Sequence, residues 1–230
     1  MKIRDSVTVI TGASRGIGLA IAERLGTEGA KLILAARSGR ALSEAAARIP
    51  DAMAVPADIT SSDGIQKLVD ATMKRHGRID LWINNAGQGL RAPVGEIKLA
   101  DYRAIMELNV FAALDAMQAV IPIMKRRHKG MILNIGSMVS KNYYPGLAAY
   151  ASTKYALNAL TLTAREELKT EGIVVSVFHP RMTATEFGAN ALGTPYSSAA
   201  GRPGMQVDSA ETVAMKVAEQ IVSEAAEANM

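Results

Sequence analysis

Short apolar runs alternate with longer stretches of helical periodicity along this chain of 230 residues, and the alternation constrains its fold more than any other feature. Runs such as Val7–Ile10 and Ile173–Phe178 are apolar at most successive positions instead of at every second one. Strands of this kind are typical of parallel sheets that helices cover on both faces. The pattern therefore predicts a doubly wound α/β fold, a parallel sheet of six strands in the order 3-2-1-4-5-6.

We expect one domain over residues 1–230. The expected strands are Val7–Thr11, Leu32–Ala36, Ala52–Val55, Ile79–Asn84, Met131–Ile135 and Val174–His179. The expected helices are Gly16–Thr27, Ser38–Ile49, Ser61–His76, Leu99–Arg127, Ala148–Thr170 and Asp208–Ala225, with capping residues at Ser38 and Ser61. Residues 180–206, rich in Pro and Gly, are longer than an ordinary connection and are expected to form a lid over a substrate. No seventh strand is expected after the last helix.

Composition narrows the function classes. Without cysteine the chain has no disulfide, no thiolate metal site and no cysteine nucleophile. Its three histidines are scattered, so no metal site is predicted. The start of the chain lacks the pattern of a signal peptide, and the apolar runs are shorter than the roughly 20 residues of a membrane span. We therefore expect a cytoplasmic protein that binds no membrane.

A glycine-rich turn, Gly12-Ala13-Ser14-Arg15-Gly16-Ile17-Gly18, joins the first strand to the first helix. Glycine in such a turn lets the backbone approach a pyrophosphate, and the helix N-terminus favours its negative charge. The spacing G-x-x-x-G-x-G differs from the usual G-x-G-x-x-G fingerprint. The turn predicts a dinucleotide site in a Rossmann-type sheet; a glycine turn with a structural role only is the alternative.

The end of the second strand indicates which nicotinamide coenzyme would fit. A carboxylate there would hold a ribose 2′-hydroxyl and repel a 2′-phosphate. This chain has Arg37-Ser38 instead, and Arg15 is expected nearby. Guanidinium groups bind phosphate bidentately, which favours NADP(H). The alternative is that both arginines are only solvated surface residues.

Tyr150 and Lys154 stand four residues apart at the start of an expected helix, so they share one face. A cation beside a phenol stabilises the phenolate and tunes it for proton transfer. Alone, the Y-x-x-x-K pattern is weak, because such pairs also occur on ordinary helix surfaces.

The glycine turn, Asn84-Asn85-Ala86-Gly87, Ser137 and the Tyr150/Lys154 pair together resemble the short-chain dehydrogenase/reductase family. Order and spacing agree over about residues 5–185. The resemblance implies a catalytic set of Asn109, Ser137, Tyr150 and Lys154.

Each member of this set takes a role from the family. Tyr150 would be the general acid/base, and Ser137 would orient the substrate oxygen. Lys154 would bind the nicotinamide ribose and lower the pKa of Tyr150, while Asn109 would support a water in a proton relay. A structural asparagine inside a long helix is the alternative for Asn109.

The resemblance also implies a set of cofactor contacts along the strand ends. They are Gly12, Ser14, Arg15, Gly16, Ile17, Gly18, Arg37, Ser38, Asp58, Ile59, Asn85, Ala86, Gly87, Tyr150, Lys154, Pro180, Thr183 and Thr185. A structural role tying strand ends together remains open for Asn84 and Asn85. The family's glycine after Pro180 is Arg181 here, which leaves the local backbone open.

The resulting hypothesis is an NADPH-dependent reductase of ketones or aldehydes, running reversibly as an alcohol dehydrogenase. Ser137, Met138, Tyr144 and Met182 are the candidate substrate residues, although methionine also fills cores. A 3-oxoacyl thioester reductase is the alternative within the class, and a non-catalytic NADPH-sensing module is the alternative outside it.

Two further expectations concern partners. The basic run Lys125–Lys129 ends a helix, where cations complement the helix dipole, so nucleic-acid binding is not expected. The two long helices, Leu99–Arg127 and Ala148–Thr170, resemble those that build a four-helix interface in the family. A homodimer or homotetramer is therefore expected.

Overall fold

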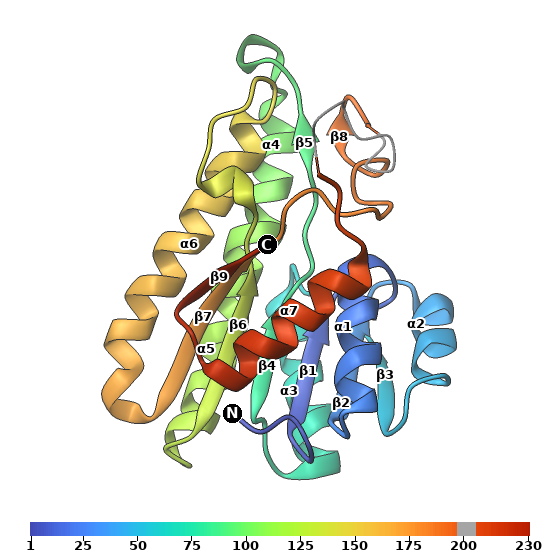
Figure 1. The fold of residues 1–230 in the computed structure, drawn as a ribbon, viewed down its shortest axis with the longest axis vertical. Coiled ribbons are helices and arrows are strands. Elements are labelled where there is room, and N and C mark those ends of the chain that lie inside the picture. The colour runs from blue at the N-terminus through green and yellow to red at the C-terminus, as the bar shows by residue number, and fades with distance from the viewer. Residues whose placement is uncertain (197–205) are drawn as a thin grey trace.

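The computed structural model describes residues 1–196 and 206–230 (Figure 1). Its main sheet has seven parallel strands in the order β3-β2-β1-β4-β6-β7-β9. These strands are β1 Val7–Thr11, β2 Lys31–Ala36, β3 Ala52–Pro56, β4 Leu81–Asn84, β6 Gly130–Ile135, β7 Ile173–His179 and β9 Glu227–Asn229. The doubly wound fold and the predicted order of the first six strands are confirmed.

Helices cover both faces of the sheet, as strands apolar on both sides require. They are α1 Gly16–Thr27, α2 Gly39–Ala46, α3 Ser62–His76, α4 Leu99–Met106, α5 Ala112–Lys125, α6 Ala148–Leu168 and α7 Ala210–Ser223. Apolar side chains of α1, α2 and α7 pack on one face of the sheet, and those of α3, α5 and α6 on the other. Neighbouring residues on one strand accordingly join different cores, as Leu32 and Ile33 of β2 do.

The expected helix over Leu99–Arg127 is interrupted. A π-helical turn, Glu107–Phe111, separates α4 from α5 and carries Asn109 near its middle. Such turns insert one extra residue and are frequent at functional sites. Of the two predicted capping residues, Ser61 is confirmed, because its hydroxyl accepts a hydrogen bond from the Gly64 amide. Ser38 precedes α2 but makes no side-chain capping bond within the described part of the chain.

The prediction that no seventh strand follows the last helix is wrong. After α7 the chain turns at Glu224, which has a φ of 57°, and β9 then pairs in parallel with β7 (Figure 1). The segment lacks β-branched residues and is rich in Ala and Glu, so propensity gave no strand signal. Its place is decided by long-range contacts: Glu227 pairs with Lys141 at 2.7 Å and with buried His179 at 3.1 Å.

A small second sheet lies beyond the carboxyl ends of the main strands. It pairs β5, Leu90–Arg91, with β8, Leu192–Gly193 (Figure 1). Of the predicted lid, residues 180–196 and 206 are described, and they leave β7, form β8 and reach the start of α7; residues 197–205 lie outside the described residues.

The helical run Leu99–Lys125 is, by length and composition, long and apolar enough to cross a membrane. Its most apolar window has a mean hydropathy of 1.5, and 44% of that window is buried inside the molecule. Ala116, Met117 and Val120 of this run belong to the core beside the sheet. A core helix of this kind passes the same test of length and composition.

The basic run at the end of α5 makes ion pairs within the chain. Lys125 pairs with Glu171 at 2.9 Å, and Arg127 pairs with the buried carboxylate of Asp80 at 2.7 Å. These pairs favour the structural interpretation of the run.

Candidate active site

One large cavity lies at the carboxyl edge of the parallel strands, where ligands bind in open α/β sheets. Its volume is about 1460 Å³. Every predicted site residue except Asn109 lines it. The lining residues from the prediction are Gly12, Ser14, Arg15, Gly16, Ile17, Gly18, Arg37, Ser38, Asp58, Ile59, Asn85, Ala86, Gly87, Ser137, Met138, Tyr144, Tyr150, Lys154, Pro180, Met182, Thr183 and Thr185.

The glycine turn forms a close-packed cradle in front of the N-terminus of α1. Gly12 and Gly16 have φ values of 66° and 57°, which favour glycine strongly. A Cβ on Gly18 would lie 2.4 Å from both the Gly12 carbonyl oxygen and Asn85 Nδ2. The turn is thus fixed in a shape that leaves the amide groups of the helix N-terminus facing the cavity, as a bound pyrophosphate requires.

Thr11 and Asn85 hold this cradle to the end of β4. The Thr11 hydroxyl accepts hydrogen bonds from the amides of Asn85 and Ala86, at 3.0 and 3.1 Å. Asn85 Nδ2 donates to the Thr11 carbonyl at 2.9 Å. The structural alternative for Asn85 therefore holds alongside its place in the cavity wall. Sequence reasoning missed the role of Thr11, for which its position between strand and turn is the only signal.

Asn84 has a structural role. It accepts a hydrogen bond from Trp82 Nε1 at 2.8 Å and donates to Asn134 at 2.9 Å, and Asn134 in turn donates to Thr161 at 2.8 Å. This buried chain of amides links β4, β6 and α6 behind the cavity.

The end of the cavity beside β2 and β3 is cationic. Arg15, Arg37 and Ser38 line it together with Asp58. The Asp58 carboxylate accepts hydrogen bonds from the amide and hydroxyl of Thr60, at 3.0 and 2.8 Å. These bonds, with the charge of Arg37, hold the pKa of Asp58 below its ordinary value despite some burial. Neither arginine makes an ion pair with a carboxylate within the described residues.

The predicted catalytic side chains meet at the other end. Tyr150, on the first turn of α6, is 8% exposed, and the Ser137 hydroxyl shares a hydrogen bond with it. Lys154 is 4% exposed; its Nζ donates to the Ile135 carbonyl at 2.8 Å and lies 5.9 Å from the centre of the Tyr150 ring. Phe187 closes the outer side of Tyr150, with ring centres 5.6 Å apart.

The pKa shifts differ from the expectation that Lys154 lowers the pKa of Tyr150. Burial raises the pKa of the Tyr150 phenol well above its usual value, and the neighbouring Tyr196 phenol raises it further, against the hydrogen bond with Ser137. Burial also lowers the pKa of Lys154 to about 8. Desolvation by burial is the largest cause of both shifts.

Asn109 lies behind the wall of the cavity, buried in the π-helical turn. Its amide bonds both backbone atoms of Gln88, accepting from the nitrogen and donating to the oxygen at 2.9 Å each. Nδ2 also contacts the Thr153 hydroxyl at 3.1 Å. These bonds fix the segment after Asn85–Gly87, which supports the structural alternative.

Arg181, the departure from the family pattern, does not disturb the backbone. Its guanidinium makes two bonds to the Asp208 carboxylate, at 3.0 and 3.2 Å. The backbone of Asp208 also bonds to Met182 and Ala184. This pairing joins the two ends of the predicted lid.

Other lining residues were not foreseen. Gln88, Arg91, Phe187 and Tyr196 all face the cavity. They come from the small β5–β8 sheet and its flanks, a long-range pairing that gives no local sequence signal. Within residues 1–196 and 206–230 the structure contains no group of three or more His, Asp or Glu side chains suited to a metal ion.

Comparison with known proteins agrees with this architecture. A family model described as short chain dehydrogenase matches residues 6–194. An uncharacterized oxidoreductase of Staphylococcus epidermidis is 32% identical over 185 residues, covering 80% of each chain. The chain belongs to the short-chain dehydrogenase family.

Solved structures give the same fold. A 3-ketoacyl-(acyl-carrier-protein) reductase from Brucella melitensis, complexed with NADH, has a TM-score of 0.91 at 24% identity, covering 99% of this chain and 97% of its own. A short-chain dehydrogenase from Sphingobium yanoikuyae, in complex with NADPH, has a TM-score of 0.88 at 27% identity, covering 97% of this chain and 87% of its own.

Proposed function

We propose that this protein is an NADP(H)-dependent oxidoreductase that interconverts a ketone or aldehyde with its alcohol. The observation that carries the proposal is the buried Tyr150 hydroxyl, which meets Ser137 and Lys154 in the cavity that also contains the glycine cradle. A binding module would need the cradle, but it would not need a proton donor buried beside a lysine.

The chemistry of the chain's own residues follows from this arrangement. A nicotinamide coenzyme, when bound, supplies the hydride. Tyr150, whose pKa burial raises further above neutrality, is protonated at neutral pH and acts as the donor of a proton from its phenol oxygen to the substrate oxygen. The Ser137 hydroxyl donates a second hydrogen bond to that oxygen and stabilises the negative charge that develops there.

Lys154 has a positioning and an electrostatic role. One of its protons is held by the Ile135 carbonyl, which leaves two donors for ribose hydroxyls. Its positive charge favours the phenolate at the moment when Tyr150 loses its proton. The same charge is present only while Lys154 is protonated.

The preference for NADP(H) rests on the cationic end of the cavity. A 2′-phosphate would lie beside Arg15 and Arg37, where β2 ends in Ala36 and offers no carboxylate to repel it. One of the two solved structures is complexed with NADH and the other with NADPH, so they do not favour either coenzyme. The proposed preference therefore rests on Arg15 and Arg37 of this chain.

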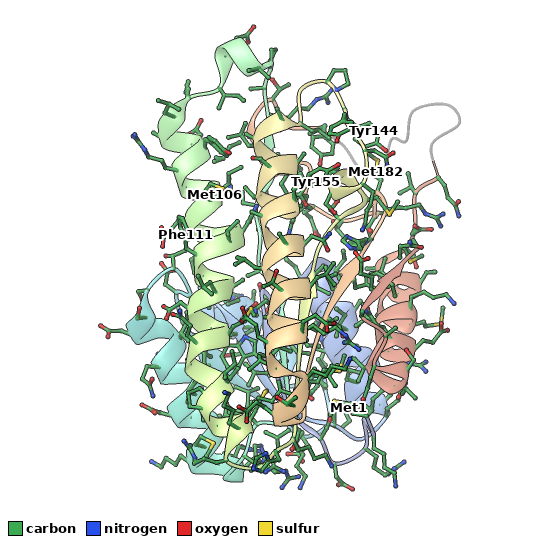
Figure 2. All side chains as sticks on the ribbon, turned by 90° about the vertical axis from the view of Figure 1, so that its left-hand side faces the viewer. Met1, Met106, Phe111, Tyr144, Tyr155 and Met182 are labelled. Atoms are coloured by element: carbon green, nitrogen blue, oxygen red, sulfur yellow. The ribbon has the colours of Figure 1, made fainter. Side chains whose placement is uncertain are left out.

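We also propose that a second copy of the chain packs on the face formed by α4, the π-helical turn and α6. Figure 2 shows Met106, Phe111 and Tyr155 on this face. Phe111 is 50% exposed and Tyr155 is 36% exposed. A homodimer would cover these side chains, and substitution of Phe111 by aspartate should give a monomer by light scattering.

The proposed reaction is tested by NADPH oxidation over a panel of ketones, aldehydes, quinones and 3-oxoacyl thioesters. Tyr150→Phe removes the proton donor and keeps the ring, so turnover should fall at least about a hundredfold while NADPH binding persists. Tyr102→Phe is the matched control, because it removes a hydroxyl that bonds to Ser152 at 2.8 Å outside the cavity. Equal activity in both variants would rule out the mechanism.

Cofactor preference has its own test. Arg37→Ala should weaken NADPH binding by about ten- to a hundredfold and leave NADH binding nearly unchanged, because a charge-assisted hydrogen bond is worth about 1.5–3 kcal/mol. Arg40→Ala, on the exposed side of α2, is the control. Equal losses for both coenzymes in Arg37→Ala would contradict the assignment.

A further inference from the structure

A half-buried arginine stands in the substrate end of the cavity without an anionic partner. Arg91, the last residue of β5, lines the cavity together with Tyr144, Tyr150 and Tyr196. Within residues 1–196 and 206–230, no carboxylate pairs with Arg91 and its guanidinium donates no hydrogen bond to the protein. Removing a charge from water without a partner is costly, so such a group is a candidate for ligand binding.

The other arginines of the cavity have different positions. Arg15 and Arg37 lie at the end assigned to the cofactor's 2′-phosphate. Arg181 also lines the cavity, but its bidentate ion pair with Asp208 already neutralises the charge of its guanidinium. Arg91 is therefore the arginine at the proposed substrate end whose charge no carboxylate of the described residues compensates.

Nearby acidic residues do not change this picture. Asp58 and Glu186 line the cavity. Asp58 accepts its hydrogen bonds from Thr60 at the cofactor end. Glu186 belongs to the predicted lid and is exposed, and within the described residues it makes no ion pair with Arg91. Residues 187–207 contain no Asp or Glu at all. Glu186 is thus the one carboxylate in the sequence of the lid, and it is not paired with Arg91 within the described residues.

The backbone around Arg91 fixes where its side chain begins. The Arg91 carbonyl accepts a hydrogen bond from the Thr194 amide at 2.9 Å, and the next amide, of Ala92, donates to Gly146 at 3.0 Å. Arg91 is also in register with Gly193 across the small sheet. A cation held on paired strands at the cavity wall is better positioned than one on a free loop.

The side chain of Arg91 reaches over an aromatic ring that faces the catalytic tyrosine. Its guanidinium carbon is 5.7 Å from the centre of the Tyr196 ring. Burial raises the pKa of Tyr196 and the charge of Arg91 opposes this, while Tyr196 in turn raises the pKa of Tyr150. Stacking over a ring leaves the N–H donors at the guanidinium edge available to an anion.

We propose that the substrate carries an anionic oxygen group, carboxylate or phosphate, that binds Arg91 while its carbonyl oxygen faces Ser137 and Tyr150. This inference rests on the proposed carbonyl reduction and narrows its substrate class. The Arg91 guanidinium lies over the Tyr196 ring, whereas the Ser137 hydroxyl bonds to Tyr150, so we expect the anionic group to be separated from the reacting carbonyl rather than attached to it. Figure 2 shows Tyr144 and Met182, which line the same cavity, at this end of the molecule.

The test compares ketones that differ in charge. 4-Acetylbenzoate, its neutral methyl ester and 4-acetylphenyl phosphate present the same ketone opposite a carboxylate, an ester or a phosphate. NADPH oxidation gives kcat/KM for the wild type, for Arg91→Gln and for Arg24→Gln, a control on the exposed side of α1. Thermal unfolding checks that each variant is folded.

The wild type should favour an anionic ketone over the ester, and Arg91→Gln should lower kcat/KM for that anion at least about tenfold, mainly through KM. The ester should change less than about threefold, and Arg24→Gln should change neither. The anion with the higher kcat/KM shows whether the site prefers a carboxylate or a phosphate. An ester that is reduced as well as both anions, or an anion preference that survives in Arg91→Gln, overturns the proposal.

Measurements of ligand binding test the anion site independently of the proposed reaction. Calorimetric titration of 4-acetylbenzoate and of 4-acetylphenyl phosphate, with and without NADPH, is compared between wild type and Arg91→Gln. Anion binding that depends on Arg91 in the absence of any turnover supports the anion site and refutes the reaction. Ester reduction without Arg91-dependent anion binding supports the reaction and refutes the site. If neither anion binds or reacts, the anion site is refuted.

Discussion

Asp80 offers the sharpest test of the electrostatic framework. This buried carboxylate, just before β4, accepts hydrogen bonds from the Val7 amide at 2.9 Å, Arg78 Nε at 2.8 Å and Arg127 Nη1 at 2.7 Å. It thereby joins the start of β1, the start of β4 and the end of α5. Asp80→Asn keeps the shape but leaves two guanidinium groups without a counter-charge.

The expected cost lies between the values for buried and exposed ion pairs. Breaking a fully buried pair costs about 3–5 kcal/mol, and an exposed pair contributes about 0–1 kcal/mol. The Asp80 side chain is 9% exposed, whereas those of Arg78 and Arg127 are 35% and 34% exposed. We therefore expect Asp80→Asn to lower the free energy of unfolding by about 2–3 kcal/mol, which corresponds to a Tm lower by about 4–12 °C.

The pH dependence adds a second check. Burial raises the pKa of Asp80, but the Val7 amide and the two arginines together hold it below its ordinary value of 3.8. A depressed folded-state pKa means stability that is present above the unfolded pKa and is lost as pH falls through the folded one. The difference between wild type and Asp80→Asn should therefore be constant from about pH 5 to 8 and shrink below about pH 4.

Urea unfolding followed by circular dichroism measures this difference. Glu44→Gln, which breaks the exposed pair with Arg40 at 3.0 Å, is the control and should cost less than about 0.5 kcal/mol. A loss below about 1 kcal/mol in Asp80→Asn, or one that persists unchanged at pH 3, would refute the reasoning.

Three other predictions follow from the site. Gly18→Ala should weaken NADPH binding at least about tenfold in a fluorescence titration, because its Cβ would meet the Gly12 carbonyl; Gly95→Ala, with open space around it, should not, and equal binding would contradict the cradle. Carbonyl reduction should decline as pH rises through about 8, where Lys154 loses its proton; Lys154→Arg should remove that limb of the pH profile, and an unchanged limb would assign it to another group. Burial lowers the pKa of His179 in the folded protein below its ordinary value of 6.5. As the pH drops below 6.5, the histidine is therefore protonated in the unfolded chain before it is protonated in the folded one, and the free energy of unfolding falls. His179→Gln should flatten unfolding measurements between about pH 5 and 6.5, and parallel wild-type and variant curves would exclude this origin.

The predicted catalytic and cofactor residues that carry local signals could be placed in the fold from the sequence. Gly12, Gly16 and Gly18 mark one turn, and Tyr150 and Lys154 mark one helix face, so the spacing alone brings them near the carboxyl edge of a parallel sheet. The pKa shifts of these residues could not be predicted from the same local signals. The raised pKa of Tyr150 comes from burial beneath Phe187 and Tyr196, which lie far along the chain.

The hydrogen-bond partners of Arg181 and Asn109 could be identified only from the structure. Arg181 stands where glycine was expected, and only the pairing with Asp208 shows how its charge is accommodated. The role of Asn109 in a proton relay stays a prediction, and the structure adds that its side-chain amide bonds the backbone of Gln88. In both cases the partner lies more than 20 positions away in the sequence.

By itself the sequence determined the doubly wound sheet and its order over the first six strands, since apolar periodicity and turn chemistry act over a few neighbouring residues. The resemblance to the family implied most of the residues that line the cavity. Only the tertiary structure decided that Glu227–Asn229 forms a seventh strand and that Arg91 lines the cavity without an anionic partner from the described residues. Both outcomes depend on pairing between segments distant in the chain, β9 with β7 and β5 with β8. A segment's own propensity cannot encode such pairing, because the free energy that stabilises it comes from the partner strand and the surface it covers.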